Sequence, residues 1–86
     1  MKRTPVTSSQ IAAIGYNPAT KEMDLEFVNH SKDKEKPNNV YRYSNVTQVD
    51  FTALVNAESL GKHFGANIKN NKAMPYRKLS QEEAAQ

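Results

Sequence analysis

One short segment, residues 22–29, restricts the fold more than any other part of the chain. Three acidic and three apolar residues alternate there, in the order Glu22, Met23, Asp24, Leu25, Glu26 and Phe27. A period of two is typical of a strand with one buried and one solvated face, as found in antiparallel sheets. We therefore expect such a sheet, and we expect the three carboxylates to face solvent rather than to hold a divalent cation.

Two further segments have strand composition. Residues 10–16 form an apolar run that ends at the Asn17-Pro18 turn signal. Residues 40–43 alternate, which places Tyr41 and Tyr43 on one face. Both segments are long enough to pair with residues 22–29 in the same sheet.

The rest of the strand pattern is weaker. Ser31 to Asn39 contains no apolar side chain, which predicts a solvated loop. Residues 73–79 alternate loosely, and Pro75 restricts them to an edge strand or an extended arm.

Two helices are expected between these segments. Thr47 is placed to cap the first, and Asp50 lies in its first turn, where a carboxylate favours the helix dipole. Ser59 is placed to cap a shorter second helix. We expect that helix to run through Phe64 and to end at Gly65 in a left-handed conformation.

The chain therefore predicts an α+β fold, a small antiparallel sheet of three to four strands with two helices packed on one face. With 86 residues and no cysteine, it has room for one core and no disulfide. We expect a single domain over residues 1–86, with a core region 6–79 and a flexible tail 80–86. The expected core residues are Ile14, Leu25, Phe27, Phe51, Leu54, Phe64 and Ile68.

Composition narrows the function classes. The first twenty residues lack an apolar stretch of signal-peptide length, and no run approaches the roughly 20 apolar residues of a membrane span. We expect a cytoplasmic protein without a membrane partner. Thiolate ligands are absent, and His30 and His63, the two histidines, lie far apart in the sequence. We therefore expect no metal site and no cofactor.

Positive charge is concentrated in one segment. The net charge is only +3, but residues 59–79 hold no acid and five cations, namely Lys62, Lys69, Lys72, Arg77 and Lys78. The segment also holds asparagines, a histidine and a tyrosine, a mixture that suits phosphate oxygens, base edges and one stacking platform. The candidate ligand-binding residues are Ser59, Gly61, Lys62, His63, Asn67, Lys69, Lys72, Tyr76 and Arg77. The alternative interpretation is a solvated basic face that only keeps the chain soluble.

Two other patterns have competing interpretations. Tyr16, Tyr41 and Tyr43 would form a base-stacking surface if exposed, but tyrosines at alternating strand positions are more often core or helix-covered.

Ser59 and His63 are four residues apart, as a nucleophile and its base on one helix would be. No third member or oxyanion site accompanies them, so we do not expect an enzyme.

Motifs along the chain resemble one family. The most specific is Ala57-x-Ser59-x-Gly61-x-x-Phe64-x-x-x-Ile68-Lys69. The others, in order, are Val6 with Ser8-Ser9, Ile14-Gly15-Tyr16, Leu25 with Phe27, Tyr41-Arg42-Tyr43 followed by Val46, and Tyr76. Together they resemble the KTSC domain family, named for its occurrence at the C-terminus of some lysyl-tRNA synthetases. The resemblance implies a small sheet followed by helices, found in larger enzymes and as short stand-alone proteins of bacteria and phages.

The leading hypothesis is non-catalytic binding of a phosphate-bearing nucleotide ligand, RNA or a small or cyclic nucleotide signal, by residues 59–78. By association with the family's occurrence in phages, such a binder would act as a homo-oligomeric counter-defence sponge that sequesters an immune nucleotide in the host cytoplasm. The alternative is a protein-protein interaction module that uses the sheet edge or the Tyr face. The two hypotheses differ in the salt dependence of binding, which is strong for phosphate ligands.

Overall fold

The structure of the chain, a computed structural model, describes residues 1–29 and 37–85. Its elements are β1 (Thr4–Pro5), β2 (Ile11–Asn17), β3 (Glu22–Phe27), β4 (Asn39–Tyr43), α1 (Gln48–Val55), α2 (Leu60–Asn67), β5 (Tyr76–Lys78) and α3 (Gln81–Ala84). The strands form one antiparallel sheet in the order β1-β2-β3-β4-β5. The α+β class is confirmed. Residues 31–36 of the predicted loop lie outside the described residues, and Asn39 belongs to β4.

The sheet has five strands in the described residues, so the expectation of three to four strands was too low. The unexpected strand is β1, which pairs Thr4 with Ile14 and Pro5 with Ala13. Its two residues are too few to show alternation in the sequence. Proline is tolerated there because β1 is an edge strand.

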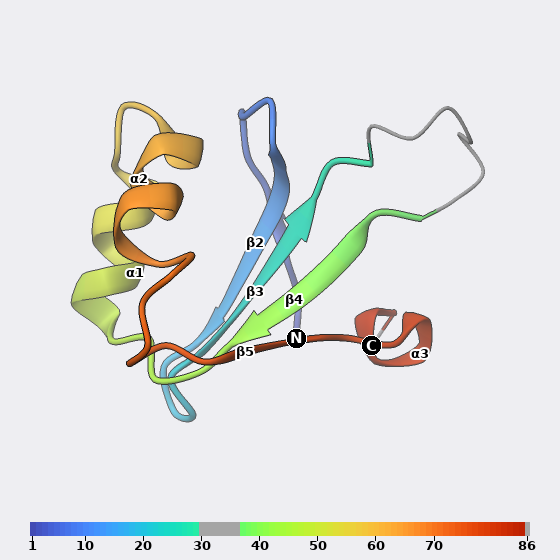
Figure 1. The fold of residues 1–86 in the computed structure, drawn as a ribbon. Coiled ribbons are helices and arrows are strands. Elements are labelled where there is room, and N and C mark those ends of the chain that lie inside the picture. The colour runs from blue at the N-terminus through green and yellow to red at the C-terminus, as the bar shows by residue number, and fades with distance from the viewer. Residues whose placement is uncertain (30–36, 86) are drawn as a thin grey trace.

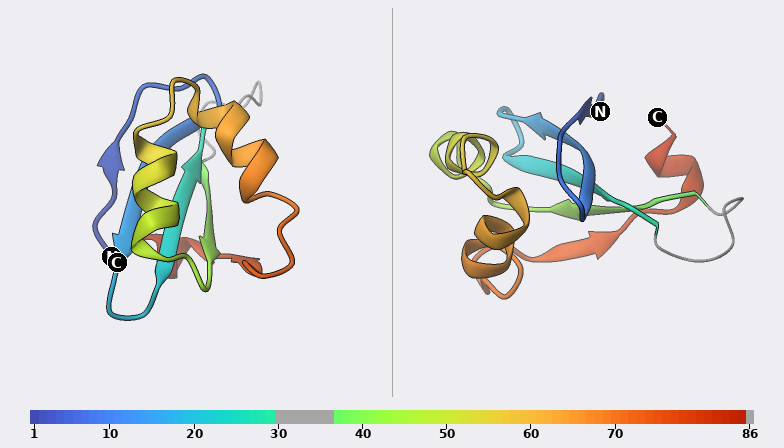
Figure 2. Two further views of the ribbon diagram at one scale, coloured as in Figure 1. Left: turned by 90° about the vertical axis from the view of Figure 1, so that its left-hand side faces the viewer. Right: turned by 90° about the horizontal axis from the view of Figure 1, so that it is seen from above.

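Figures 1 and 2 show how the layers are arranged. Helices α1 and α2, both in the connection between β4 and β5, lie over one face of the sheet. The short helix α3 lies on the other side, away from α1 and α2. Among the described residues, no helix combines the length and apolar composition needed to cross a membrane.

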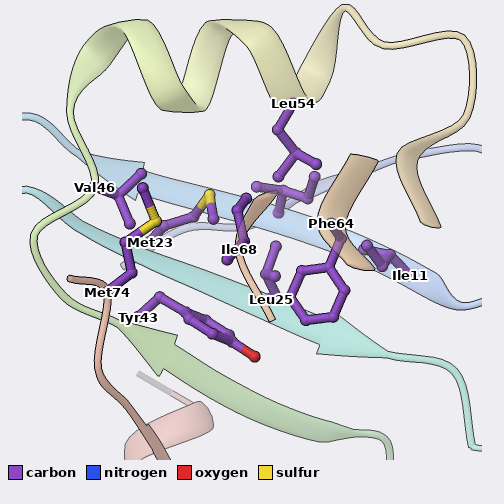
Figure 3. Packing of buried hydrophobic residues seen from close by; sticks show 10 residues of the cluster. Ile11, Met23, Leu25, Tyr43, Val46, Leu54, Phe64, Ile68 and Met74 are labelled. Carbon is purple, nitrogen blue, oxygen red and sulfur yellow. The ribbon is translucent and has the colours of Figure 1, made fainter. Parts of the chain in front are cut away.

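The core fills the space between the sheet and the two long helices (Figure 3). Met23 and Leu25 alternate onto this face from β3, as their spacing predicts, and Leu54 of α1 packs over them. A bulge between Ile11 and Ala13 shifts the register of β2, so that Ile11 pairs with Phe27 while Ile14 pairs with Leu25. Both isoleucines are buried as a result. Of the expected core, only Phe27 and Phe51 are partly rather than fully buried.

The predicted helix starts are confirmed. The Thr47 hydroxyl oxygen accepts from the Asp50 backbone N–H at 3.2 Å, and the Ser59 hydroxyl oxygen accepts from the Lys62 N–H at 3.4 Å. The predicted stop at Gly65 was wrong, because α2 continues to Asn67 and no described glycine has a positive φ. The extra turn brings Ile68, four residues beyond Phe64, into the core beside it.

Residues 80–85, which belong to the expected flexible tail, include the short helix α3 and its cap. Ser80 caps α3, because its hydroxyl oxygen accepts from the Glu83 N–H at 3.2 Å and the Glu83 carboxylate accepts from the Ser80 N–H. The Ser-x-x-Glu spacing is the sequence signal of such a capping box. Arg77 pairs with Glu83 at 3.0 Å, and Arg3 donates to the Ala84 carbonyl at 2.9 Å.

The carboxylates of β3 do not form the expected solvated face. Asp24 is only 1% exposed and accepts two hydrogen bonds from the Arg42 guanidinium, at 2.8 and 2.9 Å. The Asn38 amide and the Arg3 guanidinium both donate to Glu26 and lower the pKa of that carboxyl. The N-terminal segment crosses this face so closely that a Cβ at Gly15 would lie 2.7 Å from the Lys2 carbonyl oxygen. Both chain ends therefore cover the sheet face that the alternation in residues 22–29 predicted to be exposed to solvent.

Candidate aromatic groove

A groove of about 470 Å³ opens beside α2, over the β4 and β5 side of the helix-covered face. We call it the aromatic groove. It is lined by Gln10, Phe27, Val28, Tyr41, Tyr43, Phe64, Lys69, Asn70 and Tyr76. Pockets of this size, with mostly aromatic walls and few polar groups, are typical of small-molecule sites.

Strand register explains why the aromatic side chains gather. In antiparallel pairing, Tyr43 lies opposite both Met23 and Tyr76, and Tyr41 lies opposite Leu25. Residues opposite one another share a face. The tyrosines of β4 and β5 therefore share the face of the core residues Met23 and Leu25.

The rings contact one another closely. The Tyr76 ring centroid lies 5.2 Å from that of Tyr43 and 5.9 Å from that of Tyr41. On the inner side, Phe64 of α2 packs edge-on against Tyr43 at 5.7 Å and against Phe27 at 5.3 Å. The exposed fraction increases from the inner wall to the rim of the groove, from 3% for Tyr43 to 57% for Tyr76. The groove thus has a fixed inner wall and one accessible ring at its rim.

Tyr43 is a buried residue whose hydroxyl has no partner among the described residues. Figure 3 shows its ring beneath Phe64, with the hydroxyl oxygen on the side of Phe64 and away from Met74. Among the residues that the structure describes, none forms a hydrogen bond with this hydroxyl. No fully shielded side-chain polar atom in the described part of the chain lacks a partner. The Tyr43 oxygen must therefore reach the groove surface.

The predicted site residues do not form a single surface. Lys69 and Tyr76 line the aromatic groove. Ser59, Gly61 and Lys62 line a second hollow of about 390 Å³, together with residues 7–10. Gln10 borders both hollows, and a Cβ at Gly61 would lie 3.1 Å from its Oε1.

The other predicted residues lie elsewhere. His63 and Asn67 line a narrow cleft of about 230 Å³ next to Asp50 of α1. Lys72 is exposed in the turn after α2. Arg77 pairs in register with Arg42, on the opposite face of the sheet from Tyr76, and is bound to Glu83.

The candidate ligand-binding residues did not include most of the groove lining, namely Gln10, Phe27, Val28, Tyr41, Tyr43, Phe64 and Asn70. The favoured interpretation of the tyrosines as core or helix-covered residues fits Tyr16 and Tyr43. Tyr16 stacks on Phe51 of α1 at 4.6 Å, and Tyr43 is buried. That interpretation left out the possibility that a buried tyrosine also lines a groove. The usable signal was the spacing of Tyr41 and Tyr43, combined with Tyr76 on a pairing strand.

The described residues include no group of three or more histidine, cysteine, aspartate or glutamate side chains that could hold a metal ion. Glu22, Asp24 and Glu26 do not form such a group because Asp24 and Glu26 bind arginines. The chemistry available in the groove is therefore stacking, hydrogen bonding and charge attraction.

Comparison with known proteins identifies the family. Residues 7–71 match the model of the KTSC domain. An uncharacterized protein of Stutzerimonas stutzeri (strain A1501) is 33% identical over 69 residues, which cover 80% of this chain and 86% of that protein. The crystal structure of a KTSC domain protein from Yersinia pestis superposes with a TM-score of 0.76 at 28% identity, covering 92% of this chain and 97% of the other. The chain therefore belongs to the KTSC domain family.

Proposed function

We propose that this protein is a non-catalytic binding module for a phosphate-bearing nucleotide, and that the aromatic groove holds the ligand. The observation that carries the proposal is the combination of tyrosine rings and one cation, Lys69, around a single hollow. Nucleotides combine a flat ring with an anion, so they are bound by aromatic side chains placed near a positive charge.

Tyr76 supplies the stacking surface. Its ring is 57% exposed, yet its position is fixed on one side by the rings of Tyr41 and Tyr43. A base that stacks on an already positioned ring meets little loss of side-chain freedom. Stacking of one base on one aromatic side chain contributes about 1–3 kcal/mol.

Lys69 supplies the charge for the phosphate. Its side chain is exposed at the end of α2, and no described carboxylate lies within ion-pair distance of it. An unpaired ammonium is available to a phosphate without first losing another partner. Arg77, in contrast, is bound to Glu83 on the other face and is not part of the proposed site.

The test is calorimetric titration of the purified protein with nucleoside monophosphates and short RNAs at physiological salt. We expect at least one of these ligands to bind, and Tyr76→Ala to weaken that binding about 5- to 100-fold. Lys69→Ala should also weaken it, whereas the matched variant Lys72→Ala removes an exposed lysine outside the groove and should not. Binding that survives Tyr76→Ala and Lys69→Ala unchanged would contradict the assignment of the groove.

The outer edge of β5, the last strand of the sheet in the described residues, favours a second candidate, the protein-protein interaction module. Backbone hydrogen bonds from Leu79 N–H to the Val40 carbonyl and from Ser44 N–H to the Pro75 carbonyl set the pairing of β4 with β5. In this register the backbone groups of Tyr76 and Lys78 point away from β4. An extended peptide could add there as a sixth strand and place a side chain in the groove.

One substitution separates the two candidates. Lys78→Pro removes an outward N–H without removing a bond to β4, so it would block strand addition. Nucleotide binding should tolerate Lys78→Pro as well as it tolerates the charge control Lys78→Ala. If a captured protein partner is lost only with the proline variant, the edge-strand function is the correct one.

A further inference from the structure

We propose that the aromatic groove takes a single free nucleoside monophosphate rather than an RNA strand, and that the Tyr43 hydroxyl donates a hydrogen bond to the edge of its base. The inference rests on the proposed function, and it specifies the size of the ligand and the residue that contacts the base edge. Two independent observations carry it, the state of Tyr43 and the distribution of the cations.

Tyr43 differs from an ordinary buried tyrosine. The residue is only 3% exposed, yet none of the described residues accepts its hydroxyl proton. The hydroxyl itself reaches the groove surface, so a ligand there can supply the partner that the protein does not. Burial, with Tyr76 and Tyr41 close by, raises the pKa of Tyr43 to about 12, so the hydroxyl keeps its proton at neutral pH. It therefore acts as a donor toward the groove, and base edges carry nitrogen and oxygen acceptors.

The groove geometry brings stacking and donation together. Tyr76 and Tyr43 are neighbours across β4 and β5, with centroids 5.2 Å apart and rings tilted by 31°. A flat ring inserted beside Tyr76 would present its edge to the inner wall, where the Tyr43 hydroxyl reaches the surface. Lys69 lines the same groove at the end of α2, where its ammonium would contact the phosphate.

The cations are distributed in a way that does not suit a strand of nucleic acid. Proteins that bind single strands combine stacking rings with a continuous positive groove along the backbone. Here Lys69 lines the aromatic groove, Lys62 lines a separate hollow, and Arg77 lies on the opposite face of the sheet. Lys78 shares the sheet face of Tyr76 but lines another hollow, beside Ser80. Successive phosphates of an RNA strand would therefore meet separate cations rather than a continuous positive groove.

The experiment compares the four common nucleoside 5′-monophosphates with ten-nucleotide RNAs of matched base composition, titrated calorimetrically at low and physiological salt. We expect a monophosphate to bind at least as tightly as the RNA, and the slope of log affinity against log salt to stay below about one. An RNA that binds tighter, with a slope that corresponds to several phosphates, would overturn the choice of a free nucleotide.

Tyr43→Phe tests the hydroxyl, because it removes one oxygen and leaves the ring in place. We expect affinity for the preferred monophosphate to fall about 3- to 10-fold, as for the loss of one neutral hydrogen bond. An unchanged thermal midpoint of the free variant would show that the fold is intact. Unchanged affinity in an intact Tyr43→Phe variant would overturn the role of the hydroxyl.

The outcomes separate this inference from the proposed function. If no monophosphate and no RNA binds, both fail. If a nucleotide binds and Tyr76→Ala abolishes binding while Tyr43→Phe does not alter it, the proposed function stands and the inference falls.

Discussion

Two tyrosines on the same face of the sheet, Tyr16 and Tyr43, have opposite surroundings. Tyr16 lies beneath α1, where its ring stacks on Phe51 with an interplanar angle of 8° and its hydroxyl donates to the Val46 carbonyl at 2.6 Å. Tyr43 lies beneath α2, where its ring contacts those of Phe64 and Tyr76, and its hydroxyl has no partner in the described part of the chain. Tyr16 is therefore part of the closed core, whereas the Tyr43 hydroxyl faces the aromatic groove.

The difference follows from where the helices lie. The α1 side of the sheet is closed, since Val46 is fully buried at the start of the helix and supplies the acceptor that Tyr16 needs. On the β5 side, the chain turns away after Ile68 and leaves Tyr76 exposed. The fold thus combines a structural half and an open half on one sheet face. This comparison predicts different responses to the same kinds of change.

The largest effect is expected in the closed half. Phe51→Ala removes the ring that stacks on Tyr16, and loss of a large aromatic side chain from a core costs about 3 kcal/mol of the free energy of unfolding. In a domain of this size the thermal midpoint should fall by more than about 10 °C. Val49→Ala on the same helix is the control, because Val49 is 77% exposed and should change little. A small loss with Phe51→Ala would show that α1 is not an essential part of the core.

The open half should respond to alkaline pH. Tyr43 has its pKa raised by burial to about 12 from the ordinary value of 10, so the folded state holds this proton more tightly than the unfolded state. The corresponding stability is complete below pH 10 and is lost as the pH rises toward 12, by about 2 kcal/mol. Urea unfolding at intervals between pH 9 and pH 12 measures the loss. Tyr43→Phe should remove this part of the pH dependence, and an identical profile in that variant would contradict the interpretation.

The same substitution at the two positions gives the sharpest contrast. Tyr16→Phe leaves the Val46 carbonyl without its donor, so we expect a loss of about 1 kcal/mol in the free energy of unfolding. Tyr43→Phe removes a hydroxyl that has no described partner and should change the stability at neutral pH by less than about 0.5 kcal/mol. Denaturant unfolding of both variants tests this difference, and equal losses would mean that the two hydroxyls are equivalent.

Much of the fold could be predicted because its signals are local. Alternation in residues 22–29 predicted β3, and the hydroxyls of Thr47 and Ser59 predicted both long helices. The two-residue strand β1 and the bulge near Ala13 were not predictable in this way. The strand β1 is defined only by its pairing with β2, and the bulge only by the register between β2 and β3, so neither has a signal in its own residues.

The site was harder to predict because adjacency in sequence does not give adjacency in a sheet. Tyr76 and Arg77 are neighbours in the chain, but successive strand residues point to opposite faces, so only Tyr76 enters the groove. Tyr43 and Tyr76, in contrast, lie far apart in sequence and opposite each other in register. The charge of residues 59–79 indicated one basic surface. In the structure, the register of β5 and the turn after α2 place these cations on different parts of the surface.

The smallest effect is expected for Arg77→Ala, which separates the two models of the site most directly. If residues 59–78 acted as one basic surface, removal of this cation would weaken nucleotide binding as much as Lys69→Ala does. In the structure, Arg77 lies opposite Arg42 on the face away from the aromatic groove, and Glu83 binds its guanidinium at 3.0 Å and raises its pKa. We therefore expect affinity in calorimetric titration to stay within about twofold of the unmodified chain. A loss equal to that of Lys69→Ala would mean that the ligand contacts both faces of the sheet edge, so the groove alone could not be the site.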